Sequence, residues 1–109
     1  MRKSDKYKIQ VFCPINAVEK VRLAIGKAGG GIIGKYTYCA SLTNGYGYFL
    51  PMKGSKPTIG KQGKIEKVRE VKIETVCEEK KVKEVVRAIK KVHPYEEVSI
   101  DIFQLLDLE

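Results

Sequence analysis

The chain contains 109 residues with a formal net charge of +8 at pH 7, and 43% of its residues are hydrophobic and 31% charged. This length is that of one domain and excludes a two-domain enzyme with a cleft between its domains, and the composition excludes a disordered chain. No apolar run approaches the about 20 residues of a membrane-spanning helix, and residues 1–6 lead into no apolar segment of a signal peptide. We therefore expect one cytoplasmic domain over residues 1–109, with its core at about residues 7–106 and no membrane partner.

Two stretches of the chain repeat one pattern at an offset of 64 residues. Each begins with the alternation typical of a β-strand, around residues 7–13 and 71–77, and continues with the apolar spacing of a helix over residues 18–28 and 82–92. Two such units in tandem, each followed by another strand, predict an α+β fold. This is the ferredoxin-like split βαβ sandwich, with an antiparallel sheet and both helices on one face. The identical positions are Ile9 and Ile73, Cys13 and Cys77, Val18 and Val82, Val21 and Val85, Ala24 and Ala88, and Ile25 and Ile89.

The ends of the two predicted helices carry recognisable signals. Asn16, with Glu19 three residues later, predicts a capping box at the start of the first helix. The acidic pair at 78–79 predicts the first turn of the second helix, where the helix dipole favours acids. Glycines at 29–31 predict the end of the first helix, and the His-Pro pair at 93–94 predicts the end of the second.

A strand is expected after each helix, over residues 35–42 and 99–105. Residues 43–46, Thr-Asn-Gly-Tyr, predict a hairpin turn that leads to an extra strand at 46–52. Residues 53–63 are rich in Gly, Pro and Lys and predict an irregular loop between the two halves.

The charge is distributed unevenly along the chain. Residues 1–91 carry +13, whereas residues 92–109 contain no Lys or Arg and carry −5. The basic part predicts either a polyanion partner or a well-solvated Lys-rich surface. The acidic segment could meet basic surface in its own fold or in a neighbouring copy.

Two motifs suggest binding of nucleotides or nucleic acids. The glycines at 29, 31 and 34 match a dinucleotide fingerprint and most of a P-loop, but a helix precedes them and a strand follows, which is the reverse of the required order. Residues 44–51 resemble the RNA-stacking signature of RRM domains, with Asn and Pro at its ends instead of the usual residues. A single-stranded nucleic-acid site that uses Tyr46, Tyr48 and the basic surface therefore stays an alternative.

Candidate catalytic groups are few. His93 is the single histidine, so a multi-His metal site cannot form within one chain, and we expect its imidazolium to complement the second helix's C-terminus. Three cysteines without a C-x-x-C pair (Cys13, Cys39 and Cys77) indicate buried reduced thiols rather than a zinc site or disulfides, although the sequence does not say whether Cys13 and Cys77 are close. Neighbouring acids at 96–97 point to opposite faces of an extended segment. We expect no enzymatic activity and no cofactor.

Four motifs occur in one order along the chain: Ile33-Gly34-Lys35-Tyr36-x-x-Cys39, Gly45-x-Gly47-x-Phe49-x-Pro51, Gly54-x-x-Pro57-x-Ile59-Gly60-x-x-Gly63, and His93-Pro94-Tyr95-Glu96-Glu97 before an acidic strand. Together they resemble the Nif-three-like family (Ngg-one-interacting factor three). The resemblance covers about residues 7–106 and is to small stand-alone members, because in long members the equivalent segment looks like an insert. The domain also resembles the PII signalling and CutA proteins, the latter with a similar His-Pro-Tyr-Glu phrase.

This resemblance implies a homo-oligomer, with a trimer as the first expectation, because PII and CutA relatives are trimeric. It does not imply the metal-dependent hydrolase activity of the GTP cyclohydrolase type, because the metal ligands of long members lie in flanking halves. Val98 departs from the family pattern, in which Pro is common at that position.

The leading hypothesis is a non-catalytic regulatory or ligand-binding module with a small-anion or metal site between subunits. A purely structural or protein-docking module is the other alternative. Special backbone positions on loops indicate binding more often than core positions do. The ligand-binding candidates are Tyr36, Cys39, Tyr46, His93, Tyr95 and Glu96.

Overall fold

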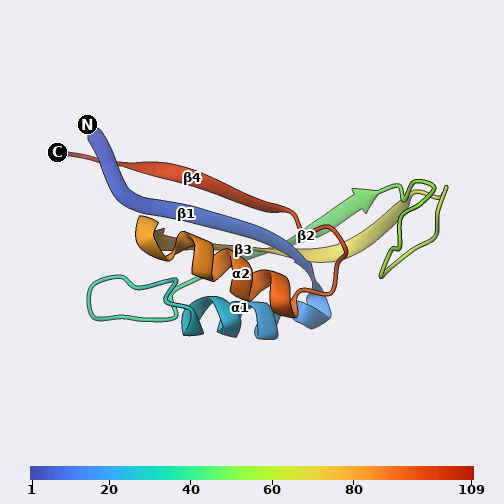
Figure 1. Cartoon of the computed structure of the whole chain (residues 1–109), viewed down its shortest axis with the longest axis horizontal. Coiled ribbons are helices and arrows are strands. Elements are labelled where there is room, and N and C mark those ends of the chain that lie inside the picture. Colours follow the sequence, from blue (N-terminus) through green and yellow to red (C-terminus); the bar gives the residue numbers. More distant parts are fainter.

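A computed structural model describes residues 1–109 and contains one four-stranded sheet with two helices. The strand order is β2-β3-β1-β4, every neighbouring pair is antiparallel, and both helices cover the same face (Figure 1). The predicted split βαβ arrangement is therefore confirmed. In chain order the elements are β1 (Arg2–Pro14), a 3₁₀ turn (Ile15–Ala17), α1 (Val18–Lys27), β2 (Ser41–Phe49), β3 (Glu66–Glu78), a 3₁₀ turn (Glu79–Lys81), α2 (Val82–Val92) and β4 (Ile100–Asp107).

The internal repeat is visible in the element boundaries. β1 and β3 end at Pro14 and Glu78, and α1 and α2 begin at Val18 and Val82, so both pairs keep the offset of 64 residues. The paired strands β1 and β3 form the centre of the sheet, and the two helices pack side by side beneath it (Figure 1).

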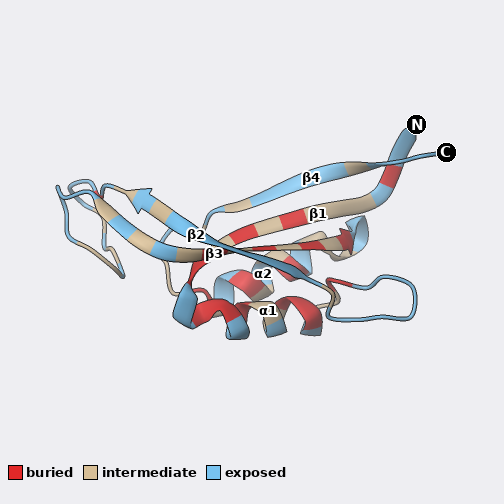
Figure 2. Cartoon of the chain, turned by 180° about the vertical axis from the view of Figure 1, so that it is seen from behind, coloured by how far each residue is buried: buried red, intermediate tan, exposed pale blue.

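The core lies between the central strands and the helices. Every second residue is buried over residues 9–13 of β1 and 71–77 of β3, whereas the residues between them, which face the other side of the sheet, are half-buried (Figure 2). Burying one such aliphatic side chain stabilises the fold by about 1.5–3 kcal/mol. The core residues are Ile9, Val11, Cys13, Ala17, Val18, Val21, Ile25, Val71, Ile73, Cys77, Val85 and Ile89.

α1 and α2 begin at residues 18 and 82 as predicted, but the predicted capping signals at these starts are wrong. Asn16 lies in a 3₁₀ turn, Ala17 is the N-cap residue of α1, and no side chain caps that helix. Glu78 is the last residue of β3, and Glu79 opens the second 3₁₀ turn. Each strand thus passes into its helix through a tight turn, which displaces the helix start beyond the residues that carry the capping signal.

The predicted helix ends are confirmed. Gly29 follows α1 with a φ of 99°, and the Gly30 N–H donates to the Ile25 carbonyl at 3.0 Å. This left-handed glycine closes the last turn of the helix. His93 is the C-cap residue of α2 and has extended dihedral angles, as expected of a residue before proline.

The middle of the chain differs from the prediction. The expected strand at 35–42, turn at 43–46 and extra strand at 46–52 are replaced by the single strand β2. The Asn-Gly pair lies inside it, with Asn44 opposite Val71 and Gly45 opposite Glu70 on β3. A continuous ladder along the edge of the thirteen-residue strand β3 outweighs the local preference of Asn-Gly for a turn.

The irregular segment between β2 and β3 spans residues 50–65 and includes the predicted loop 53–63. β4 confirms the predicted strand at 99–105 with a shift of one or two residues.

The cysteines are free, and two of them are buried as predicted. Cys39 is only half-buried, because it lies in the loop that precedes β2. Cys13 pairs with Val71 and Cys77 with Tyr7 in the antiparallel ladder, so Cys13 and Cys77 lie at opposite ends of it.

Candidate functional site

The six candidate residues fall at different places along the sheet. Three of them, His93, Tyr95 and Glu96, belong to the corner that we define as residues 93–97, at the end of the molecule that carries loop 50–65 (Figure 1). Tyr36 and Cys39 lie in the loop at the other end, and Tyr46 is exposed on β2.

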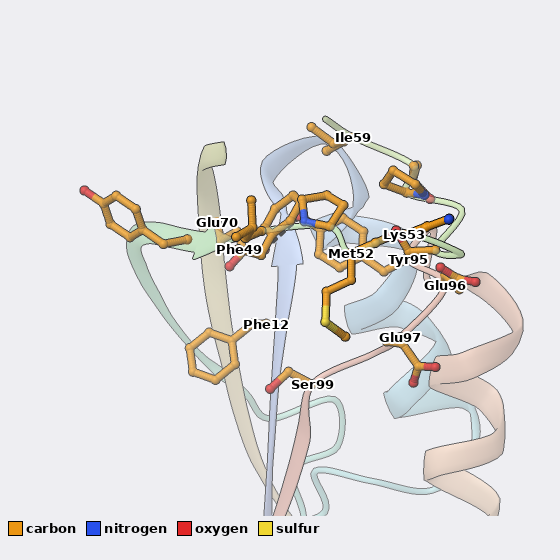
Figure 3. A pocket seen from close by; sticks show the side chains of 16 residues that line it. Phe12, Phe49, Met52, Lys53, Ile59, Glu70, Tyr95, Glu96, Glu97 and Ser99 are labelled. Atoms are coloured by element: carbon orange, nitrogen blue, oxygen red, sulfur yellow. Dashed lines mark hydrogen bonds between the residues drawn. The ribbon is translucent and has the colours of Figure 1, made fainter. Parts of the chain in front are cut away.

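A cavity of about 710 Å³ lies between the corner, loop 50–65 and the ends of β1, β2 and β3. Figure 3 shows side chains from all of these segments around it. The neighbours of Phe12 and Glu70 along β1 and β3 point into the core, so these two side chains lie on the face of the sheet that the helices leave open. Phe49 lies on the same face, because it is four residues along β2 from Gly45, the pairing partner of Glu70. The lining residues are Phe12, Tyr48, Phe49, Leu50, Pro51, Met52, Lys53, Ser55, Pro57, Thr58, Ile59, Glu70, Tyr95, Glu96, Glu97 and Ser99.

His93 fixes the corner on the end of β1. Its Nε2 lies 2.8 Å from the Phe12 carbonyl oxygen, and its Nδ1 accepts the Tyr95 N–H at 3.1 Å. Because a carbonyl only accepts, Nε2 carries the proton, and the ring is neutral with both nitrogens occupied. Burial lowers the pKa of His93 below its usual value, although the hydrogen bond to Phe12 opposes this shift. The expected helix-capping imidazolium is thus replaced by a buried neutral ring, and neither nitrogen is left for a ligand.

Tyr95 carries the corner to β3. Its hydroxyl donates to the Glu70 carboxylate at 2.7 Å, and its ring lies 4.9 Å from that of His93 and 6.4 Å from that of Phe49, measured between centroids. Burial, together with the neighbouring carboxylate of Glu70, raises the pKa of Tyr95 far above its usual value. The phenol therefore stays protonated and acts as a hydrogen-bond donor rather than as an acid or base.

Gly47 on β2 makes room for this contact. A Cβ atom at Gly47 would lie within 1.9 Å of the Glu70 carboxylate, whereas a Cβ at Gly45 would meet nothing within 4 Å. A larger residue at 47 would therefore displace the Glu70 carboxylate.

The corner also holds loop 50–65. Glu96 accepts the backbone N–H of Lys56 at 2.8 Å, and the Pro94 carbonyl accepts the Thr58 hydroxyl at 2.5 Å. Within the loop, the Gln62 amide donates to the Ser55 carbonyl at 2.8 Å. The corner thus defines one wall of the cavity and positions the opposite one.

The cavity combines aromatic surface with negative charge. Its charged side chains are one lysine, Lys53, and three glutamates at 70, 96 and 97. Glu97 is exposed and makes no hydrogen bond or ion pair within the chain. Such a lining suits a positively charged group with an apolar part, and it repels an anion.

Sequence reasoning missed Phe12, Phe49 and Glu70 as lining residues. Their roles depend on which strands pair. The signal that could have indicated Glu70 is Gly-x-Gly at 45–47, because a glycine inside a strand often marks close approach of a neighbouring group.

At the other end of the molecule, Tyr36 is 76% exposed at a loop tip. Cys39 is bound through its backbone: its N–H donates to the Gly31 carbonyl at 2.8 Å, and its carbonyl accepts the Thr75 hydroxyl at 2.7 Å. Its thiol lies near the Thr37 carbonyl, so the structure gives this residue an anchoring role in the loop.

Tyr46 belongs to a third surface. Lys67 lies over the rings of Tyr46 and Tyr48, at 4.3 Å and 5.8 Å from their centroids. Both tyrosines are more than half exposed and point to the same side of β2.

No group of three or more His, Cys, Asp and Glu side chains is placed to hold a metal ion. No helix is long and apolar enough to span a membrane.

Comparison with known proteins relates this architecture to a segment of larger ones. No family model matches the chain. A GTP cyclohydrolase 1 type 2 homolog of Halalkalibacterium halodurans is 48% identical over 99 residues, which are 91% of this chain and 27% of that protein. A Bacillus cereus protein related to NIF3 superposes with a TM-score of 0.82 and 37% identity over 96% of this chain and 27% of its own. The chain is homologous to the inserted domain of these NIF3-related proteins. It spans about a quarter of the length of the relatives that it matches.

Two groups of smaller proteins share the fold along most of their length. CutA1 from Pyrococcus horikoshii superposes with a TM-score of 0.67 at 23% identity, over 94% of this chain and 86% of its own. The GlnK protein of B. subtilis gives 0.62 at 18% identity, over 92% and 84%. At these identities the likeness shows the fold alone, so this NIF3-related domain has a PII/CutA-like structure.

Proposed function

We propose that this NIF3-related domain is a non-catalytic ligand-binding module that works as a homo-oligomer. Its binding site is the acidic, aromatic cavity between the corner and loop 50–65, and the group bound there is an organic cation with an apolar part. The observation that carries the proposal is the combination of Glu70, Glu96 and Glu97 with the rings of Phe49 and Tyr95 in one cavity.

The size and chemistry of the cavity support this choice of ligand. Its volume of about 710 Å³ lies within the range of small-molecule sites. The lining carries two more negative than positive side chains, which disfavours the small anion expected from the sequence. Its glutamates do not converge as metal ligands, which disfavours a metal ion. An ammonium or guanidinium group gains both from a carboxylate and from an aromatic face.

Thermal unfolding of the whole chain in the presence of defined probes tests the proposal. Tyramine and agmatine, which join a cation to an apolar part, should raise the melting temperature progressively with concentration, because a ligand that binds only the folded state stabilises it by mass action. ATP, phosphate and Zn²⁺ should give smaller shifts. A larger shift with ATP than with either amine would contradict the proposal that the cavity binds a cation.

Two matched variants place the binding at the cavity. Glu97→Gln removes an exposed, unpaired carboxylate from the lining and should weaken amine binding severalfold without changing the stability of the free protein. Glu109→Gln removes an exposed carboxylate outside the cavity and should leave binding unchanged. Equal effects of the two variants would mean that the amines bind by general charge attraction.

The oligomeric part of the proposal follows from the PII/CutA-like fold, with a trimer as the first expectation. Native mass spectrometry of the untagged chain measures the number of copies and any small molecule that is retained. A monomer at micromolar concentration would contradict this part.

A second function is favoured by the surface around Tyr46 and Tyr48. Two exposed rings on one side of β2, with Lys67 above them and Arg69 opposite Tyr46, form a stacking surface with positive charge. Base stacking on aromatic rings contributes about 1–3 kcal/mol per base in single-strand binders.

Fluorescence anisotropy with a labelled oligonucleotide tests this alternative. Binding should weaken steeply as salt is raised, because neutralised phosphates release counterions. Changing both Tyr46 and Tyr48 to alanine should remove it, whereas Tyr36→Ala, at a more exposed ring outside this surface, should not. Absence of binding at low salt would exclude the alternative.

A further inference from the structure

We propose that the cavity of one copy receives the hairpin tip of a second copy, which we define as residues 32–36. Lys35 is then the cation and Tyr36 the aromatic group that the cavity binds. This inference rests on the proposed function of the cavity and names its partner as another copy of this chain.

The tip has a fixed conformation. The N–H groups of Ile33 and Tyr36 each donate to the carbonyl of the other residue at 2.9 Å, which closes a two-residue turn. Gly34 opens this turn with a φ of 57°, which a residue with a side chain adopts only under strain. The backbone of Lys35 and Tyr36 is therefore held in one conformation before any partner arrives.

The base of the tip is anchored on the body of the domain. The Gly31 N–H donates to the Val76 carbonyl at 2.7 Å, and the backbone of Cys39 is bound to Gly31 and Thr75. The ring of Tyr38 lies against Gly26 of α1, where a Cβ atom would overlap it. Tyr38 itself has a φ of 58°, so the chain accepts an unfavourable backbone conformation to place this ring.

The anchored tip exposes apolar side chains. Ile32 and Ile33 are each 51% exposed and Tyr36 is 76% exposed. Ordering this loop costs conformational entropy, and its apolar side chains offset little of that cost because they are not buried within the chain. An exposed apolar patch on an ordered loop therefore indicates an interaction surface.

Charge identifies the surface that this tip fits. Lys35 is the single charged residue between positions 28 and 52. The cavity carries the opposite charge, including the unpaired carboxylate of Glu97, and offers the rings of Phe12 and Phe49 to an aromatic partner. The tip and the cavity therefore match in both sign and apolar character.

The shape of the domain makes this contact intermolecular. The tip and loop 50–65 extend from opposite ends of a molecule that is 49 Å long and 27 Å wide (Figure 1). A chain cannot fill its own cavity with its own tip, but a head-to-tail neighbour can. Contacts of this kind generate a closed ring when the rotation between copies closes. The docked tip thus completes the site and forms the oligomer.

Native mass spectrometry of exposed-residue variants tests the inference. Tyr36→Asp places a carboxylate at the tip, and Glu97→Lys places an ammonium group in the cavity. Each variant should lose the oligomer and appear as the 12.3 kDa monomer. An equimolar mixture of the two should form a one-to-one dimer, because only one intact tip and one intact cavity remain. Tyr46→Asp, at another exposed tyrosine outside the tip and the cavity, should keep the wild-type oligomer.

A wild-type monomer, an oligomer that survives Tyr36→Asp, or a mixture that stays monomeric would overturn the docking of the tip. Tyramine binding to the Tyr36→Asp variant separates this failure from failure of the proposed function. If tyramine stabilises that variant while the docking test fails, the cavity takes a free organic cation. If neither occurs, both proposals are wrong.

Discussion

Replacing Gly47 by alanine tests how the corner is held on the sheet. The new Cβ atom would lie 1.9 Å from the nearer carboxylate oxygen of Glu70, so this side chain must move. The same carboxylate accepts the Tyr95 hydroxyl at 2.7 Å, and this hydrogen bond is therefore lost.

The expected size of the effect follows from two opposing contributions. A hydrogen bond to a charged group contributes about 1.5–3 kcal/mol to the free energy of unfolding. Replacing glycine by alanine in an unstrained position stabilises a protein by about 0.4–1 kcal/mol, because the unfolded chain loses freedom. We expect a net destabilisation of about 1–2 kcal/mol, which corresponds to a decrease in melting temperature of about 4–15 °C for a domain of this size.

Urea unfolding of three variants checks this reasoning. Gly45→Ala is the matched control on the same strand, and it should be neutral or slightly stabilising, because nothing lies within 4 Å of the added atom. In a Glu70→Ala background, Gly47→Ala should lose its destabilising effect, since the carboxylate that it displaces is absent. Equal stability of the Gly45 and Gly47 variants, or an unchanged effect of Gly47→Ala in that background, would refute the account.

Two further predictions concern titratable groups. Burial lowers the pKa of His93 below the unfolded value of about 6.5, so the folded state binds fewer protons at this residue than the unfolded state does. The contribution of neutral His93 to the free energy of unfolding is therefore complete above the unfolded pKa and is lost as the pH falls through the folded pKa. Urea unfolding at several pH values should show this loss, and His93→Gln, which keeps a neutral donor for the Phe12 carbonyl, should flatten the pH dependence; an unchanged slope would contradict the neutral ring. Burial and the nearby Glu70 carboxylate raise the pKa of the Cys13 thiol to about 11, so little of its reactive thiolate forms at pH 8. Iodoacetamide at pH 8 should therefore label the half-buried Cys39 first, and peptide mass spectrometry can measure the order of labelling. Early labelling of Cys13 would contradict its burial in the core.

The corner shows what sequence reasoning identified and what it could not. Their motif and their place in a loop single out residues 93–97, and the structure places them beside the cavity of about 710 Å³. The predicted positive charge of His93 is wrong, because the ring is held by the carbonyl of Phe12, which lies 81 residues earlier in the chain. The acidic character of the cavity also depends on Glu70, which only the pairing of β2 with β3 brings there.

The central strands and both helices were determined by the sequence itself. Their apolar periodicity repeats at an offset of 64 residues, and Gly29 and Pro94 end the two helices through local backbone geometry. Such signals act within a few residues and need no partner elsewhere in the chain.

Only the tertiary structure decided the course of residues 35–52 and the location of the cavity. The Asn-Gly pair at 44–45 favours a turn locally, but its backbone groups find a continuous partner in β3, and the longer ladder prevails. The cavity requires β1, β2, β3, loop 50–65 and the corner at once. Strand pairing is a long-range choice among competing partners, so neither feature is encoded in any single segment.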